Sequence, residues 1–242
     1  MSKAALLEQW GDYLARSRRR SPHTVRAYLA AANRLAGQVG AEEWCDVAAL
    51  DAAALRAQLA TRRAEGIGNA SAARELSAIK GFVAFAREQA GHVEAAPPRL
   101  RGPRIKKGLP RPVTPDDALN LADGVASLAS DHLIGARDRA VLLLMYGAGL
   151  RIAEALSLTA ADLPLGETLR VTGKGGKQRV VPLLPVVRAA VADYAQRCPY
   201  ALAGKEPLFR GAKGGAVGQG MVQKAMARAR VALGLPPTAT PH

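Results

Sequence analysis

Residues 135–158 read GARDRAVLLLMYGAGLRIAEALSL, and this stretch decides the fold of the second half of the chain. Its first part, residues 135–146, is almost entirely apolar after a charged start, so we expect a buried helix there. The Gly-Ala-Gly that follows predicts a tight turn, because glycine adopts backbone conformations that other residues avoid. A short helix is expected next, from about Arg151 to Leu158.

A second informative stretch follows shortly afterwards and reads TGKGGKQRVVPL over residues 172–183. Residues 168–172 and 178–183 flank a glycine-rich turn at 173–177, which indicates a β-hairpin. Pro182 lies near the end of the second strand and suits a strand terminus or an edge, since proline lacks a backbone N–H.

Arg151 and Glu154 stand three residues apart at the start of the short helix. Such a pair is often a surface ion pair that contributes little stability. The apolar helix and tight turn before it favour another interpretation, in which Arg151 lies in a partly buried cleft and Glu154 orients its guanidinium. A guanidinium fixed in this way is suited to binding a phosphate.

Lys174 lies at the tip of the expected hairpin, between two glycines. A lysine on a turn is usually a solvated charge, but these glycines would let the backbone approach a ligand, and the turn could reach a DNA groove. The stretch is not a Walker A loop, because Val171 and Gln178 stand where that motif needs Gly and Ser or Thr. No acidic cluster or histidine pair predicts a metal site, and no cofactor is expected.

The N-terminal part, residues 1–94, is predicted to be a bundle of four helices joined by short loops. Apolar spacing and helix-start signals place these helices around residues 6–14, from Ser21-Pro22 to about Gly37, from Asp51 to Arg63, and from about Ser71 to Ala90. Residues 95–113 contain five prolines and no helical period, which indicates a linker.

A second unit is expected over residues 114–242, beginning with a capped helix at Thr114-Pro115. Further helices are expected at about 185–197 and 219–233. The predicted fold class is therefore mainly α with a small antiparallel β-sheet: a four-helix domain followed by an α+β domain.

The chain is strongly basic, with 34 Lys and Arg against 20 Asp and Glu and a net charge of +14. This balance favours a polyanionic partner, although it could merely aid solubility. We favour nucleic acid because the cations cluster, above all in the linker; a membrane surface fits less well, because no basic stretch alternates with a large apolar face. The predicted DNA contacts are Arg99, Arg101, Arg104, Lys106, Lys107, Lys177 and Arg179.

Neither a secretory signal nor a long apolar span is visible in the sequence, so we expect a cytoplasmic protein. The two cysteines, Cys45 and Cys198, lie far apart and form neither a disulfide framework nor a metal motif.

Taken together, these motifs resemble the tyrosine recombinases, specifically the XerC/XerD chromosome-dimer resolvases. In the first half the resemblance lies in SPHTVRAY (21–28) and ARELSAIKGFVAFARE (73–88). In the second half it lies in GARDRAVLLLMYGAGLRIAEALSLTAADL followed by VTGKGGKQRVVPL, and this ordered pair is highly specific.

The resemblance implies an N-terminal core-binding domain and a catalytic domain that clamp a DNA duplex from opposite sides. Arg151 matches the first catalytic arginine, which binds the scissile phosphate, and Glu154 matches the acid that supports it. Lys174 matches the hairpin lysine thought to protonate the leaving 5′-oxygen. His242 matches the first residue of the His-x-x-Arg box, and the family uses no metal. Gly176 departs from the family, in which Asn is common.

The family also needs a second arginine and a nucleophilic tyrosine, and both are expected after His242. Tyr146, Tyr194 and Tyr200 all precede that residue, so none fits the nucleophile by position. On its own, residues 1–242 are therefore expected to lack activity, with an incomplete catalytic domain.

The resemblance implies DNA recombination and integration, chromosome partition and a role in the cell cycle at cell division. It also implies a paired recombinase in a tetrameric complex and an accompanying DNA translocase. The alternatives are a phage or mobile-element integrase, a truncated DNA-binding fragment, and a helical interaction protein outside DNA chemistry.

Overall fold

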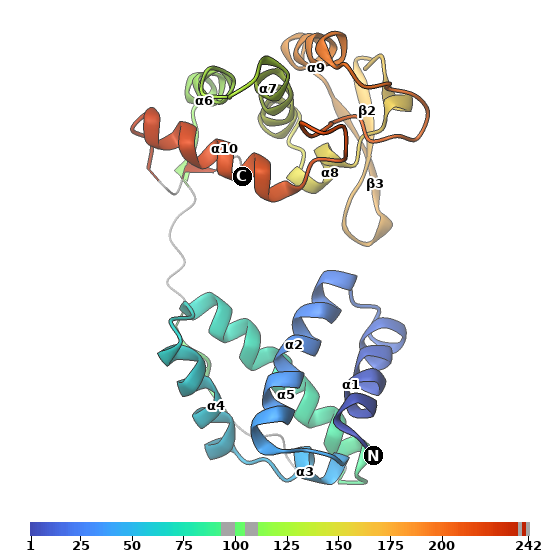
Figure 1. Ribbon diagram of the computed structural model, residues 1–242, viewed down its shortest axis with the longest axis vertical. Coiled ribbons are helices and arrows are strands. Elements are labelled where there is room, and N and C mark those ends of the chain that lie inside the picture. Colours follow the sequence, from blue (N-terminus) through green and yellow to red (C-terminus); the bar gives the residue numbers. More distant parts are fainter. Residues whose placement is uncertain (93–99, 105–110, 237–238, 241–242) are drawn as a thin grey trace. The chain divides into compact units, whose positions relative to one another are not determined.

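The computed structural model describes residues 1–92, 100–104, 111–236 and 239–240. Its contacts divide the chain into two compact units, Met1–Lys107 and Gly108–His242 (Figure 1). The predicted fold class is confirmed, because the described elements are mainly helices with a small antiparallel β-hairpin.

The regular elements described in the first unit are all helices. Its elements are α1 (Lys3–Asp12), the π-helix η1 (Tyr13–Ser17), α2 (Pro22–Val39), α3 (Trp44–Ala48), α4 (Ala52–Ala64) and α5 (Asn69–Gln89). The Ser21 side chain accepts a hydrogen bond from the N–H of Thr24, which confirms the expected start of α2. The helix continues past Gly37 and ends at Gly40, which adopts φ +64°. The short α3 and the π-helix were not predicted.

Aromatic side chains form the centre of the first unit's core. The rings of Trp10 and Tyr13 stack with centroids 5.6 Å apart, and Trp44 meets Phe85 edge to face at 5.2 Å. Phe82 is fully buried among them. These contacts join α1 and α3 to α5. Aromatic pairs of this kind contribute stability beyond the area they bury.

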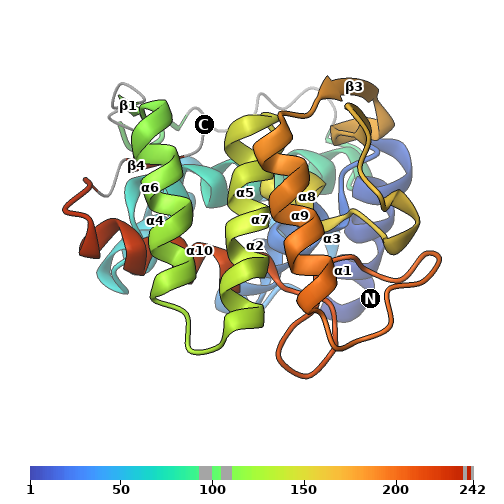
Figure 2. The same cartoon turned by 90° about the horizontal axis from the view of Figure 1, so that it is seen from above.

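The second unit packs helices against one another and beside a hairpin. Its elements are β1 (Arg111–Pro112), α6 (Pro115–Ser127), α7 (His132–Gly147), α8 (Ile152–Leu156), the 3-10 helix η2 (Ala160–Asp162), β2 (Thr168–Thr172), the 3-10 turn η3 (Lys174–Gly176), β3 (Gln178–Pro182), α9 (Pro185–Arg197), α10 (Gln219–Ala232) and β4 (Ala239–Thr240). Figure 2 shows α6, α7 and α9 side by side, and α10 crosses α6 and α7 in Figure 1.

The apolar helix α7 lies at the centre of the second unit, as the sequence predicts. It begins three residues earlier than expected, because the Asp131 carboxylate accepts hydrogen bonds from the N–H groups of Leu133 and Ile134 at 2.7 and 3.3 Å. At its other end a Cβ on Gly147 would lie 2.7 Å from Val187 Cγ2 of α9. Only glycine therefore lets the two helices approach this closely without rearrangement.

Those parts of the predicted linker that the structure describes are packed against their neighbours. Leu100 is buried in the core of the first unit, and its carbonyl accepts a hydrogen bond from Lys80 Nζ at 2.5 Å. The Asn69 side chain donates to the carbonyl of Arg104 at 3.2 Å. At the other end β1 pairs in parallel with β4, a second small sheet that the sequence did not predict. The described residues of this segment thus contact the units on either side of it.

Candidate DNA-cleavage site

The site is built on the turn between α7 and α8. Gly149 adopts φ +62°, a left-handed conformation that suits glycine, and the next residue, Leu150, is fully buried. These two residues fix the chain before Arg151, which is the N-cap of α8. The sequence thus places Arg151 at the end of a rigid turn anchored by the core.

Glu154, in the first turn of α8, is buried and accepts hydrogen bonds on both carboxylate oxygens. Oε2 accepts from the backbone N–H of Arg151 at 2.8 Å, as in the second half of a capping box. Oε1 accepts from Arg151 Nη1 at 2.9 Å. The expected contact between Glu154 and the Arg151 guanidinium is therefore present in the structure.

Arg151 itself is more exposed than the sequence suggested. Its side chain is 65% accessible, whereas that of Glu154 is 5% accessible. The expectation of a partly buried cleft for Arg151 is wrong, because α8 buries the carboxylate and leaves most of the guanidinium in solvent. One hydrogen bond to Glu154 orients the group, and the exposed guanidinium has further N–H donors that can bind a ligand.

The hairpin has the predicted strands and turn, with Thr172 opposite Gln178 in the ladder. The N–H of Gly173 donates to the carbonyl of Lys177 at 2.7 Å and closes the turn. Gly175 and Gly176 both adopt φ +76°. Asparagine also tolerates this conformation, so the departure at Gly176 leaves the turn geometry available. The backbone of Lys174 begins the turn, and its side chain lies outside the described structure.

Arg179 of β3 joins the hairpin to α8, an arrangement that the sequence did not reveal. Its Nη1 donates to Glu154 Oε1 at 2.9 Å and its Nη2 donates to Glu154 Oε2 at 2.8 Å, so the ion pair is bidentate. Nη2 also lies 3.4 Å from the carbonyl oxygen of Gly149. The two partners are 25 residues apart, so no local spacing signals the pair. Arg179 was predicted only as a DNA contact.

The electrostatics follow from this geometry. The hydrogen bonds from Arg179, together with those from the backbone and side chain of Arg151, outweigh burial and lower the pKa of Glu154 to about 2. The same ion pair raises the pKa of Arg179. Glu154 is therefore ionised at any working pH of the protein and acts as a fixed acceptor rather than as an acid.

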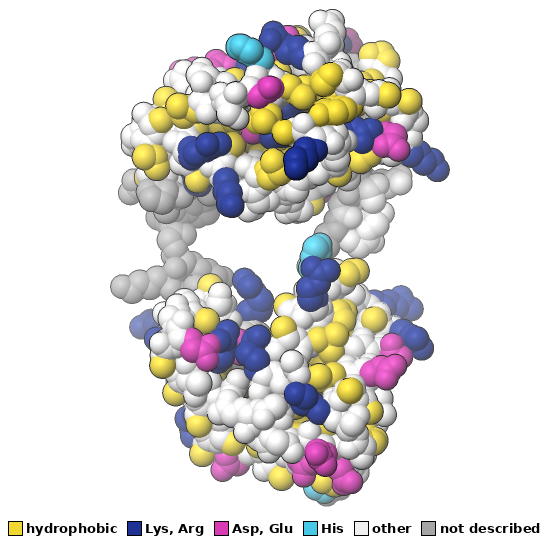
Figure 3. Space-filling view, viewed as in Figure 1, with side chains coloured by type: hydrophobic (Ala, Val, Ile, Leu, Met, Phe, Trp, Pro, Cys, Tyr) yellow, Lys and Arg dark blue, Asp and Glu magenta, His cyan; other side chains and the backbone are white. Residues whose placement is uncertain are grey.

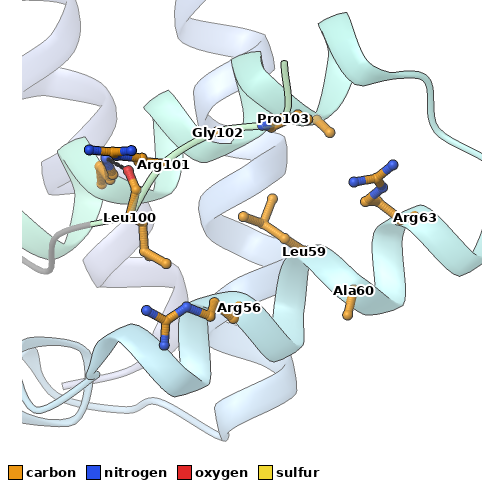
Figure 4. A pocket seen from close by; sticks show the side chains of 10 residues that line it. Arg56, Leu59, Ala60, Arg63, Leu100, Arg101, Gly102 and Pro103 are labelled. Atoms are coloured by element: carbon orange, nitrogen blue, oxygen red, sulfur yellow. Dashed lines mark hydrogen bonds between the residues drawn. The ribbon is translucent and has the colours of Figure 1, made fainter. Parts of the chain in front are cut away.

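The remaining predicted residues fall into three groups. Lys177 is exposed beside the hairpin turn, and Arg101 and Arg104 lie on the first unit. Arg101 lines a pocket of about 930 Å³ between α4, α5 and residues 100–103, together with Arg56, Arg63 and Lys80 (Figure 4). His242, Arg99, Lys106 and Lys107 lie outside the described residues.

The three tyrosines of the second unit have structural surroundings. Tyr194 is fully buried; its hydroxyl donates to the carbonyl of Leu208 at 3.1 Å and accepts from the N–H of Arg210 at 2.8 Å. Burial raises the pKa of Tyr146, and the hydroxyl of Tyr200 donates to the carbonyl of Ala212 at 2.6 Å. The hydroxyls of Tyr194 and Tyr200 are thus engaged in hydrogen bonds within the second unit.

The described residues hold neither a candidate metal cluster nor a membrane-spanning helix. Within residues 1–92, 100–104, 111–236 and 239–240, no group of His, Cys, Asp and Glu is arranged to hold a metal ion. In the same part of the chain, no helix has the length and apolar character needed to cross a membrane.

Two family profiles match the two units. Residues 7–90 match the phage integrase N-terminal SAM-like domain, and residues 113–242 match the phage integrase family. The chain belongs to the tyrosine recombinases of the phage integrase family. The family resemblance inferred from the motifs is thereby confirmed.

Curated relatives are similar over nearly the whole chain. The tyrosine recombinase XerC of Mesorhizobium japonicum (strain LMG 29417 / CECT 9101 / MAFF 303099) is 47% identical over 98% of this chain and 78% of its own length. That of Agrobacterium fabrum (strain C58 / ATCC 33970) is 43% identical over 97% of this chain and 76% of its own length. The chain thus spans about three quarters of these relatives.

Solved structures show the same fold. A XerH site-specific recombinase bound to its difH substrate is 18% identical, with a TM-score of 0.65 over 98% of this chain and 70% of that one. A lambda integrase dimer bound to a core site is 20% identical, with a TM-score of 0.63 over 98% and 83% of the two chains. At these identities the likeness concerns the fold alone.

Proposed function

We propose that this recombinase cuts and rejoins DNA at a specific site through a 3′-phosphotyrosyl intermediate, in the resolution of chromosome dimers. The observation that carries the proposal is the pairing of Arg151 with buried Glu154 at a rigid turn, beside the glycine-rich hairpin turn that begins at Lys174. The similarity to XerC proteins over nearly the whole chain favours dimer resolution over integration.

Arg151 binds the scissile phosphate. Its exposed guanidinium offers N–H donors in one plane, which fit the non-bridging oxygens of a phosphodiester. As phosphorus becomes five-coordinate, negative charge grows on these oxygens, and a donor already held by Glu154 stabilises that charge without first having to reorganise.

The tyrosine, as its phenolate, then attacks phosphorus and the bond from phosphorus to the 5′-oxygen breaks. Lys174 gives its proton to that oxygen, which leaves as a 5′-hydroxyl. Rejoining runs in reverse: a 5′-hydroxyl attacks the phosphotyrosine, its proton returns to the lysine, and tyrosine leaves. His242 and a second arginine complete the phosphate site, and the nucleophile belongs to the part of the full-length protein after His242.

The two units hold the duplex through its phosphates. Figure 3 shows Lys and Arg side chains on the visible face of both units, with fewer acidic ones. The pocket near Arg101 has four cationic side chains and no acidic one among its lining residues (Figure 4). We assign phosphate contacts to Arg101, Arg104 and Lys177, with Arg99, Lys106 and Lys107 contributing from the linker.

The working complex contains a paired recombinase in a tetramer on DNA, a DNA translocase accompanies it, and it acts in the cytoplasm.

The test is a duplex carrying a nick near the cleavage point, so that the cut strand diffuses away and the covalent adduct accumulates. The full-length protein is expected to form an adduct that resists denaturation. Residues 1–242 alone should bind the duplex without forming an adduct, and the logarithm of their affinity should fall with the logarithm of salt by about 0.9 per neutralised phosphate. A flat salt response, or an adduct on residues 1–242, would contradict the assignment.

A further inference from the structure

We propose that Arg179 is a positioning residue: through Glu154 it fastens the hairpin turn that begins at Lys174 to the turn that carries Arg151. This inference rests on the proposed function, because it assigns Arg179 a role in the step that Lys174 performs. Arg179 acts through Glu154 rather than by touching the reacting atoms.

The contacts place Arg179 between two loops that belong to different parts of the fold. It is anchored in β3, next to the hairpin turn, and its guanidinium spans both oxygens of Glu154 in α8. It also reaches the carbonyl of Gly149 in the turn before Arg151. Three hydrogen bonds from one side chain therefore set the distance between the hairpin and that turn.

Glu154 has its acceptor sites filled by this arrangement. Each oxygen accepts two hydrogen bonds, one from Arg151 and one from Arg179. A carboxylate has about four such sites, so neither arginine can move without leaving a buried acceptor unfilled. The orientation of Arg151 and the position of the hairpin are thereby coupled through a single group.

Gly173 gives independent support for a docked hairpin. A Cβ at this position would lie 3.2 Å from Glu154 Oε1 and 3.4 Å from Arg179 Nη1. The backbone entering the turn thus passes directly over the ion pair. Its φ of −92° is open to any residue, so the close approach, and not the backbone conformation, favours glycine here.

The two arginines that share Glu154 are attached to the site in different ways. Arg151 is kept near the carboxylate by its own helix, three residues away, and by its backbone N–H. Among the described residues, the hydrogen bonds between the hairpin and α8 come from the Arg179 ion pair. Loss of Arg179 should therefore displace the hairpin turn more than it displaces Arg151.

The experiment compares Arg179→Ala, Arg179→Lys and the matched control Arg170→Ala in the full-length protein. Arg170 is exposed on β2 and lies opposite Val180, so its removal takes the same charge from the same hairpin. At saturating DNA, Arg179→Ala should cleave roughly 10- to 100-fold more slowly, the size expected for a misplaced catalytic group. Arg170→Ala should cleave at the wild-type rate. Arg179→Lys should stay defective, because lysine cannot form the bidentate ion pair.

A second substrate separates positioning from a general loss of structure. In a duplex with sulfur in place of the bridging 5′-oxygen, the leaving group is a thiolate, which needs no proton from lysine because a thiol has a pKa of about 8.5. The Arg179→Ala defect should shrink at least about tenfold on this duplex, whereas an Arg151→Ala defect should persist. An unchanged defect on the sulfur duplex, or equal cleavage by Arg179→Ala and Arg170→Ala, would overturn the proposal.

Amide hydrogen exchange on residues 1–242 tests the same contact without catalysis. The N–H of Gly173 closes the hairpin turn, and it should exchange faster in Arg179→Ala than in Arg170→Ala. If the full-length wild type forms no adduct with either duplex, the proposed function fails, while exchange still decides whether Arg179 holds the hairpin. Equal exchange in the two variants would refute the positioning role.

Discussion

Two buried glutamates, one in each unit, are each bound by two arginines, yet they do different things. Glu75 of α5 accepts from Arg34 of α2 and from Arg62 of α4 at 3.1 Å. Glu154 of α8 accepts from Arg151 and Arg179. The chemistry is the same in both places, so the placement of the arginines decides the outcome.

At Glu75 the arginines come from two neighbouring helices, and the carboxylate ties these helices to α5. The Arg62 side chain is 19% accessible and that of Arg34 is 39% accessible. At Glu154 one arginine belongs to the same short helix and remains largely in solvent. The first cluster therefore joins parts of a core, whereas the second presents a cation, and this difference separates a structural ion pair from one placed for the proposed phosphate binding.

The largest effect should follow from Arg151→Ala in the full-length protein. Removing a donor that stabilises transition-state charge typically costs about 10²- to 10³-fold in rate. Single-turnover cleavage of the nicked duplex should fall by that amount, while duplex affinity measured at the same salt stays near the wild-type value.

The matched change in the other cluster is Arg34→Ala. Its effect on cleavage at saturating DNA should be small at a temperature where the variant is folded, because its carboxylate partner lies in the helical core of the first unit. A cleavage loss as large as that of Arg151→Ala would erase the distinction between the two clusters.

Spacing and turn chemistry predicted a large part of this site. The Gly-Ala-Gly turn, the short helix that begins near Arg151 and the five-residue hairpin turn all depend on nearby residues, and so the positions of Arg151, Glu154 and Lys174 along these elements could be predicted. Arg179 could not be assigned its partner in this way, because the pairing depends on how the hairpin packs against α8.

The parts of the fold that were not predicted have the same origin. The pairing of β1 with β4 joins residues more than a hundred positions apart and contains two residues on each side, too few to leave a periodic pattern. The exposure of Arg151 depends on which side of α8 faces the core. Both features depend on tertiary packing, and local propensity does not predict them.

A smaller effect is expected from Glu75→Gln, this time on stability. Glutamine keeps the shape and some hydrogen bonding but removes the buried charge that Arg34 and Arg62 share, which should cost about 1–3 kcal/mol. Both tryptophans of the chain, Trp10 and Trp44, lie in the first unit, so tryptophan fluorescence during urea unfolding reports on that unit.

The control for this change is Glu154→Gln, which alters the second unit. It should leave the tryptophan transition where it is in the wild type. If Glu75→Gln leaves that midpoint unchanged as well, the Glu75 cluster contributes nothing measurable, and its interpretation as a structural tie fails.

The smallest expected effect is the loss of the stability that Glu154 contributes when the pH is lowered. The pKa of Glu154 is lowered from 4.5 to about 2, chiefly by the hydrogen bonds from Arg179. A carboxyl group whose pKa is lower in the folded state contributes stability that is complete above its ordinary pKa and is lost as the pH falls through the folded value. The contribution of Glu154 should therefore be intact at pH 5 and disappear between about pH 4.5 and pH 2.

Carboxyl ¹³C chemical shifts of residues 1–242 labelled at glutamate would measure this directly. The resonance that Glu154→Gln removes should begin to move only well below pH 4, and in Arg179→Ala it should titrate at a higher pH, because the largest stabilising contact is gone. Arg170→Ala should leave its midpoint unchanged. A wild-type midpoint near 4.5 would mean that the two arginines do not share Glu154 in solution, and the contrast between the two glutamates would then have no electrostatic basis.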